Sequence, residues 1–135
     1  MKPLEQNVIE DLVVAASRVR AAAHVPYSKF RVGAALMDED GEVYTGCNVE
    51  NASYGLSVCA ERHAVAAAVA AGASRFHALV VFTNASPPVS PCGACRQVLS
   101  EFGNFPVILA NSAGERVQTS VEELLPLAFS AADLR

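Results

Sequence analysis

Three cysteines and one glutamate have the types and spacing that metal-assisted chemistry requires. Cys92 and Cys95 stand three residues apart, and side chains at i and i+3 share one face of a helix. Two thiolates on one face can bind a single zinc ion. Cys59 supplies a third thiol, and Glu61 places a carboxylate two residues after it. The pattern therefore predicts a zinc site with three thiolate ligands and a carboxylate beside it.

The predicted site has an open coordination position. Zinc prefers four ligands, and three protein ligands plus water are typical of catalytic zinc. Zinc acidifies such a water, and Glu61 is the residue assigned to accept its proton. Three thiolates more than cancel the charge of Zn²⁺, so positive compensation is expected. We assign it to Arg62 and to the N-termini of the two predicted helices that carry the cysteines.

Two simpler interpretations compete with the open site. A fourth ligand, either Cys47 or His63, would close the site and make it structural, and a C-x-x-C pair alone also occurs in redox dithiols. The order C-x-E followed by P-C-x-x-C favours the open site, because it is the all-cysteine variant of the zinc deaminase signature. Cys47 is then interpreted as a small buried hydrophobe.

Positioning these ligands requires two helix starts with a strand between them. Apolar spacing predicts a first helix over residues 4–23. Two further helices are predicted over 59–71 and 91–102, ended by Gly72 and Gly103. At the third helix we expect Ser90 as the N-cap and Pro91 as the first helical residue.

Apolar runs between these helices predict strands over 30–37, 43–47, 79–83 and 107–110. Asp40-Gly41 predicts a hairpin turn between the first two. Ser120 and Glu123 have capping-box spacing and predict a helical turn at 122–125. Segments 48–55 and 84–91 are predicted loops. A hairpin followed by strands alternating with helices indicates a mixed sheet with helices on both faces.

Composition limits the possible partners. The 135 residues are expected to form one domain (1–135), with 52% hydrophobic and 18% charged residues. The net charge of −4 without a basic run argues against a nucleic-acid partner, which needs phosphate contacts. No apolar stretch is long enough to span a bilayer, and the N-terminus has no signal segment. We expect a cytoplasmic protein, without membrane partners, whose four cysteines are reduced.

Five segments resemble the short homotetrameric zinc-dependent cytidine deaminases, and together they cover nearly the whole chain. They are residues 26–35, 45–55, 59–62, 90–102 and 123–126 with Phe129. The resemblance implies a three-layer α/β/α sandwich with a mixed five-stranded sheet and one zinc per subunit. It also implies hydrolysis of cytidine and deoxycytidine to uridine and deoxyuridine with release of ammonia, in pyrimidine salvage. His63, where the family has a small hydroxyl residue, and the loop 84–89, without an acidic residue, depart from the pattern.

The resemblance also implies roles for individual residues. Cys59, Cys92 and Cys95 would hold the metal, and Glu61 would carry protons to the ring nitrogen and the departing amine. The backbone of Ala60 and Ser90 would bind the base, Phe30 would pack against it, and Asn48, Val49 and Glu50 would bind the ribose. Ala52, Tyr54 and Phe129 would reach the active site of a neighbouring subunit in a homotetramer.

The residues alone support part of this assignment. In an extended segment, Asn48 and Glu50 point the same way, and both suit hydroxyl groups, although a polar surface loop would have the same pattern. Phe30 and Phe129 are equally suited to a core. Two other functions stay open: deamination of a related nucleoside such as an antibiotic, against which the ribose segment argues, and a structural zinc module, which would need no Glu61.

Overall fold

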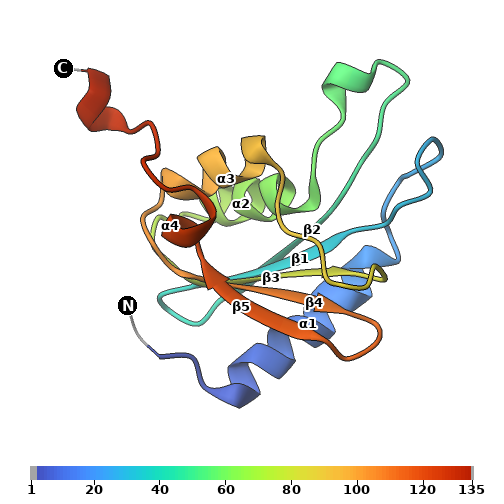
Figure 1. Ribbon diagram of the computed structural model, residues 1–135, viewed down its shortest axis with the longest axis horizontal. Helices are drawn as coiled ribbons and strands as arrows, with labels where there is room; N and C mark the ends of the chain where they lie inside the picture. The colour runs from blue at the N-terminus through green and yellow to red at the C-terminus, as the bar shows by residue number, and fades with distance from the viewer. Residues whose placement is uncertain (1–2, 135) are drawn as a thin grey trace.

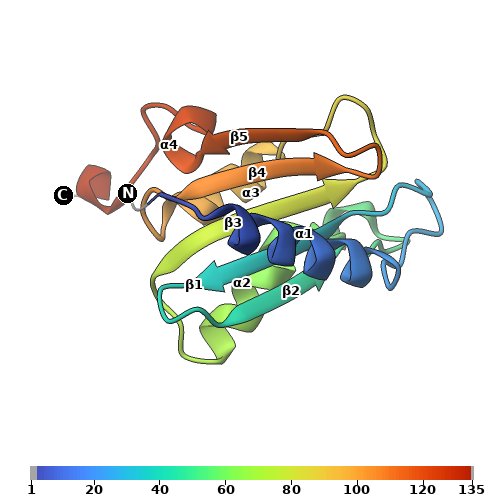
Figure 2. The ribbon, with the colours of Figure 1, turned by 90° about the horizontal axis from the view of Figure 1, so that it is seen from below.

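A five-stranded mixed sheet forms the centre of the computed structural model, which describes residues 3–134. The strand order is β2-β1-β3-β4-β5, and Figure 2 shows the sheet from the side of the first helix. Only β3 and β4 run parallel, and the other neighbouring pairs are antiparallel. The strands are β1 (Gly33–Asp38), β2 (Val43–Cys47), β3 (Phe76–Thr83), β4 (Pro106–Asn111) and β5 (Arg116–Ser120).

Helices cover both faces of this sheet (Figure 1). One face carries α1 (Gln6–Arg20), and the other carries α2 (Ala60–Ala70) and α3 (Gly93–Ser100). The short helix α4 (Val121–Leu124) and two 3₁₀ turns (Tyr54–Leu56 and Ala131–Leu134) complete the described chain. The predicted α/β/α sandwich is therefore confirmed. In residues 3–134, no helix is both long enough and apolar enough to cross a membrane.

Two apolar layers hold the sandwich together. Leu12 and Ala16 of α1 pack with Val80 and Ile108 on one face, and Leu79 belongs to the layer beneath α2 and α3. Strands β3 and β4 are buried over nearly their whole length, because both faces are covered. This explains why their sequences are continuous apolar runs instead of alternating patterns.

Most predicted elements are present, with shifted ends. The hairpin and β2 are as predicted, with Gly41 in the left-handed region at φ +87°. Strand β1 begins at residue 33 instead of 30, since Asn48 binds the backbone of residues 30 and 32. Strand β5 was not predicted, because an edge strand with exposed polar residues such as Arg116 and Gln118 lacks an apolar run.

The predicted start of α3 was wrong. The N-cap is Cys92 and the first helical residue is Gly93, not Ser90 and Pro91. The reason is the Arg96 side chain, which donates to the Pro91 carbonyl (2.8 Å) and to Ser90 Oγ (2.8 Å). These bonds use the Ser90 hydroxyl that would otherwise cap the helix. Ser120, by contrast, caps α4 as predicted and accepts the Glu123 N–H.

Gly46 lets α2 approach β2 closely. A Cβ at this position would lie 2.5 Å from the Ala60 carbonyl oxygen and 2.5 Å from the Ala64 nitrogen. Any side chain there would push away the first turn of α2. The close approach therefore helps to fix the position of Cys59, the N-cap of this helix.

Candidate zinc and nucleoside site

The three predicted ligand cysteines meet at the starts of two helices. Cys59 is the N-cap of α2 and Cys92 the N-cap of α3, with Cys95 one turn further along α3. The Cys59 and Cys92 sulfurs lie 3.8 Å apart, and those of Cys92 and Cys95 lie 3.5 Å apart. All three sulfurs lie within 4.8 Å of one another. The fold thus brings together residues that are far apart in the sequence.

This sulfur cluster fits a zinc ion. A Zn–S bond of about 2.3 Å in a tetrahedral site places neighbouring sulfurs about 3.8 Å apart, which the measured separations of 3.5 and 3.8 Å match closely. The cysteines are free thiols, the soft donors that zinc prefers. The helix N-termini at Cys59 and Cys92 favour negative sulfurs through their free N–H groups and dipoles.

Neither candidate fourth ligand belongs to this cluster. Within residues 3–134, the group of cysteines, histidines and carboxylates close enough to share an ion consists of the three cysteines alone. His63 Nδ1 lies 2.8 Å from the carbonyl oxygen of Cys47, so this contact joins α2 to β2. The described chain thus offers three protein ligands, and the open fourth coordination position stays a prediction from the sequence.

Arg62 supplies positive charge beside the sulfurs. Its Nη2 lies 3.7 Å from Cys59 Sγ. Hydrogen bonding with Cys95, together with that from Arg62, lowers the pKa of Cys59 to about 5. The same bond to Cys59 and burial raise the pKa of Cys95. The guanidinium of Arg62 thus lies beside the cysteine whose thiolate form is favoured.

Glu61 is a buried carboxyl group at the edge of the cluster. Only 4% of its surface is exposed, and it is the second residue of α2. Burial raises its pKa above the ordinary value of 4.5. A raised pKa suits a group that must take up and release protons near neutral pH.

A cavity of about 350 Å³ contains these groups and most of the predicted substrate residues. Its walls come from five regions: the 28–32 segment, the 48–50 segment, the start of α2, strand β3, and the loop before α3. The lining residues are Ser28, Phe30, Val32, Asn48, Glu50, Cys59, Ala60, Glu61, Val81, Val89, Ser90 and Cys92. A nucleoside-sized ligand in this cavity would lie against the Cys59 and Cys92 thiols and the Glu61 carboxyl.

Asn48 and Glu50 both face the cavity, and both are also bound to the loop opposite. Asn48 accepts the Val32 N–H (2.9 Å) and donates to the Phe30 carbonyl (2.8 Å). Glu50 accepts the backbone N–H groups of residues 27 and 28 at 3.1 Å each and the Ser28 hydroxyl. The Ser28 hydrogen bond lowers the pKa of Glu50. No role was predicted for Ser28, because its partner Glu50 lies 22 residues away in the sequence.

The residues predicted to act in a neighbouring subunit do not line this cavity. Ala52 is exposed, Tyr54 is 74% exposed, and Phe129 is 58% exposed on the segment after α4. Val49, predicted to bind ribose, does not line the cavity either, and its side chain is 41% exposed. These residues are therefore exposed in the single chain, where another molecule could contact them.

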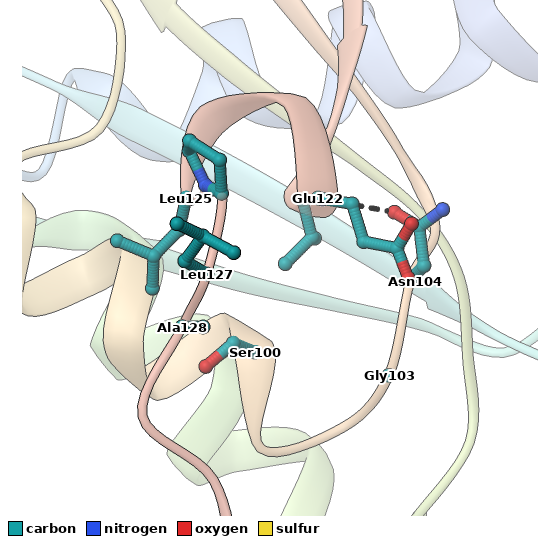
Figure 3. A pocket seen from close by; sticks show the side chains of 9 residues that line it. Ser100, Gly103, Asn104, Glu122, Leu125, Leu127 and Ala128 are labelled. Carbon is teal, nitrogen blue, oxygen red and sulfur yellow. Dashed lines mark hydrogen bonds between the residues drawn. The ribbon is translucent and has the colours of Figure 1, made fainter.

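A second hollow of about 400 Å³ lies between the end of α3 and the C-terminal segment (Figure 3). Ser100 and Leu127 lie in its wall, and Asn104 accepts the Glu122 N–H at 3.0 Å. Its lining includes no cysteine, no histidine and none of the predicted site residues. The larger volume therefore does not mark the chemical site.

The fold and the site together define a zinc-binding α/β deaminase. The family described as "Cytidine and deoxycytidylate deaminase zinc-binding region" matches residues 6–111. The cytidine deaminase of Sporosarcina psychrophila is 52% identical over 128 residues, which are 93% of this chain and 94% of that protein. The crystal structure of a cytidine deaminase from Burkholderia pseudomallei is 50% identical, with a TM-score of 0.86 over 89% of this chain and 98% of that chain. A blasticidin-S deaminase of Bacillus cereus is 32% identical over 76% of this chain and 79% of that protein.

The chain belongs to the zinc-dependent cytidine deaminase family, in the short form whose members it matches over nearly their whole length.

Proposed function

We propose that this protein hydrolyses cytidine and deoxycytidine to uridine and deoxyuridine and releases ammonia. The observation that carries the proposal is a single cavity lined by two thiols of the cluster, Cys59 and Cys92, together with the buried Glu61 carboxyl and the polar Asn48 and Glu50 side chains. Relatives named cytidine deaminases at about half identity support the same substrate class.

Glu61 moves the protons of this reaction. Zinc, when bound by Cys59, Cys92 and Cys95, supplies a Lewis acid that makes water a nucleophile near neutral pH. Glu61 takes up a proton as water adds to C4 of the base and passes it to ring N3. It then carries a proton to the departing amine, which leaves as ammonia. Its burial excludes bulk water and keeps its proton available for these transfers.

The other predicted substrate residues hold the nucleoside. The backbone of Ala60 and Ser90 binds the polar edge of the pyrimidine, and the Phe30 ring packs against its face. Asn48, Val49 and Glu50 form the ribose segment, in which the amide and the carboxylate bind hydroxyl groups. This hydroxyl-binding chemistry favours a nucleoside over the antibiotic alternative.

We further propose that the enzyme is a homotetramer in which Ala52, Tyr54 and Phe129 complete a neighbour's active site. The high exposure of both residues supports this: Phe129 is 58% exposed, and Tyr54 is 74% exposed although its ring packs edge-on against Tyr27. A mixture of Phe129→Ala and Glu61→Gln chains tests it. If Phe129 acts across subunits, the mixture regains activity that neither variant has alone. No gain on mixing contradicts the proposal.

The proposed setting is the cytoplasm, where the enzyme serves pyrimidine salvage as a single domain. Four free cysteines, three of them gathered in one cluster, are compatible with a reducing compartment.

The proposed function is tested by incubating the zinc-loaded protein with cytidine and following ultraviolet absorbance and ammonia release. Stoichiometric ammonia and uridine are expected. A protein with full zinc and no conversion of cytidine, deoxycytidine or blasticidin S would instead be a structural zinc module.

A further inference from the structure

Ser28 connects the two halves of the proposed ribose pocket through its hydroxyl group. Its Oγ donates to Glu50 Oε2 and accepts the Phe30 N–H at 3.0 Å. A serine hydroxyl has one hydrogen, and Phe30 N–H is a donor, so the hydroxyl hydrogen is the one directed to Glu50. The carboxylate and the backbone that carries the Phe30 ring are therefore joined by one oxygen atom.

Within residues 3–134, the hydrogen bonds to the Glu50 carboxylate come from the loop that contains Tyr27 and Ser28. Oε1 accepts the backbone N–H groups of Tyr27 and Ser28, both at 3.1 Å, and Oε2 accepts the Ser28 hydroxyl. The chain turns at Lys29, whose φ of +61° lies in the left-handed region. This turn allows Ser28 and Phe30 to lie on the same wall of the cavity.

These bonds leave little of the carboxylate free. A carboxylate has about four acceptor positions on its two oxygens. Three are filled by residues 27 and 28, so about one remains for a ligand. Because Oε1 already accepts two bonds, the remaining position is on Oε2, the oxygen that the Ser28 hydroxyl orients.

We propose that Ser28 is a positioning residue that turns the free acceptor of Glu50 Oε2 toward one ribose hydroxyl and so determines how strongly the enzyme requires that hydroxyl. The inference rests on the proposed function. Cytidine and deoxycytidine both have a 3′-hydroxyl, whereas only cytidine has a 2′-hydroxyl. The 2′- and 3′-hydroxyls share one edge of the sugar ring, and both substrates keep only the 3′-hydroxyl there, so we assign the single free acceptor of Glu50 to the 3′-hydroxyl.

The test combines a change in the enzyme with a change in the substrate. Wild type and Ser28→Ala are compared on deoxycytidine and on 2′,3′-dideoxycytidine, which lacks the 3′-hydroxyl. We expect Ser28→Ala to raise KM for deoxycytidine about tenfold with a smaller change in kcat, because a hydrogen bond to a charged group is lost. On dideoxycytidine, the same variant should change KM less than about threefold, because the contact is already absent.

Inhibition constants of deoxyuridine and 2′,3′-dideoxyuridine give the same comparison if the truncated substrate turns over slowly. Ser28→Thr keeps the hydroxyl and should recover most of the deoxycytidine KM. Ser100→Ala, at the far end of α3 where its hydroxyl bonds to the Gln97 carbonyl, is the matched control and should leave both substrates unchanged. Thermal melting and zinc content identify a variant that has merely lost its fold.

The positioning role of Ser28 would be overturned if Ser28→Ala changed KM equally for deoxycytidine and dideoxycytidine, or changed neither KM. A wild type that converts neither nucleoside would instead overturn the proposed function, which this experiment shows separately.

Discussion

The Arg62 guanidinium lies 3.7 Å from the sulfur of Cys59, one turn along the same helix. Its Nε is buried and has no hydrogen-bond partner within the described chain. The charge is thus directed at the thiol cluster at some cost in hydrogen bonding. We expect this positive charge to offset part of the negative charge that three thiolates would bring to a zinc site.

Replacing Arg62 by glutamine should therefore affect catalysis more than metal content. We expect Arg62→Gln to retain zinc but to lower kcat about tenfold, because a less compensated thiolate site is a weaker Lewis acid. The kcat of Arg62→Lys should lie between those of Arg62→Gln and wild type. Zinc analysis and steady-state kinetics measure the two effects. A kcat equal to that of wild type would contradict the compensating role.

Replacement by serine should remove zinc when the cysteine belongs to the cluster and should leave zinc bound when it does not. Cys95→Ser should lose zinc, because one of three sulfurs within 4.8 Å is removed. Cys47→Ser should keep one zinc per chain, since Cys47 is not part of the cluster. Metal content after dialysis against a weak chelator compares them. Zinc loss from Cys47→Ser would show that the site is closed by a fourth protein ligand.

Arg96 should support the wall of the cavity. It donates to the Pro91 carbonyl, to Ser90 Oγ, and to the Leu124 carbonyl at 2.7 Å. Arg96→Lys keeps the positive charge but loses the planar guanidinium group, whose three nitrogens donate these bonds. We therefore expect the free energy of unfolding to fall by about 2 kcal/mol. The kcat/KM should also fall, since Ser90 lines the cavity. Chemical denaturation and kinetics test this, and an Arg96→Lys variant as stable as wild type would show that these bonds contribute little.

Glu50 should remain ionised into mildly acidic solution. Its pKa is lowered from 4.5 by the Ser28 hydrogen bond, so the folded protein binds this proton less tightly than the unfolded chain. The resulting stabilisation is present above the ordinary pKa and is lost as the pH falls through the lowered value.

In a Glu61→Gln background, which removes the other carboxyl group of the cavity, binding of uridine should accordingly be constant between about pH 7 and about pH 5, because Glu50 does not titrate in that range. Calorimetry measures the dissociation constant, and zinc analysis of the same samples separates metal loss from weaker binding. Weakening centred at or above pH 4.5 in samples that keep their zinc would contradict the lowered pKa.

The sequence predicted the features whose information is local. The hairpin at Asp40-Gly41, strand β2 and the Ser120 cap follow from turn and capping rules that act over a few residues. Strand β5 could not be predicted in this way, because it is an edge strand whose pairing with β4 depends on tertiary context.

The cysteines and Glu61 were predictable because metal ligands require particular residue types at particular spacings. Ser28 and Arg96 were not, since their importance comes from partners distant in sequence. Arg96 bonds to Leu124, 28 residues away, and Ser28 bonds to Glu50, 22 residues away. The Arg96 side chain also bonds to Pro91 and Ser90, and these bonds explain why α3 begins at Gly93 instead of the predicted Pro91.

The central claim is that Glu61 moves protons beside an open three-thiolate zinc site. Its most direct test is cytidine deamination by wild type and Glu61→Gln, with zinc measured in the same samples and Glu122→Gln, a change at an exposed residue, as control. We expect Glu61→Gln to keep its zinc and to lose activity by about a hundredfold or more, while the control remains active. A Glu61→Gln variant with both full zinc and full activity would contradict the account.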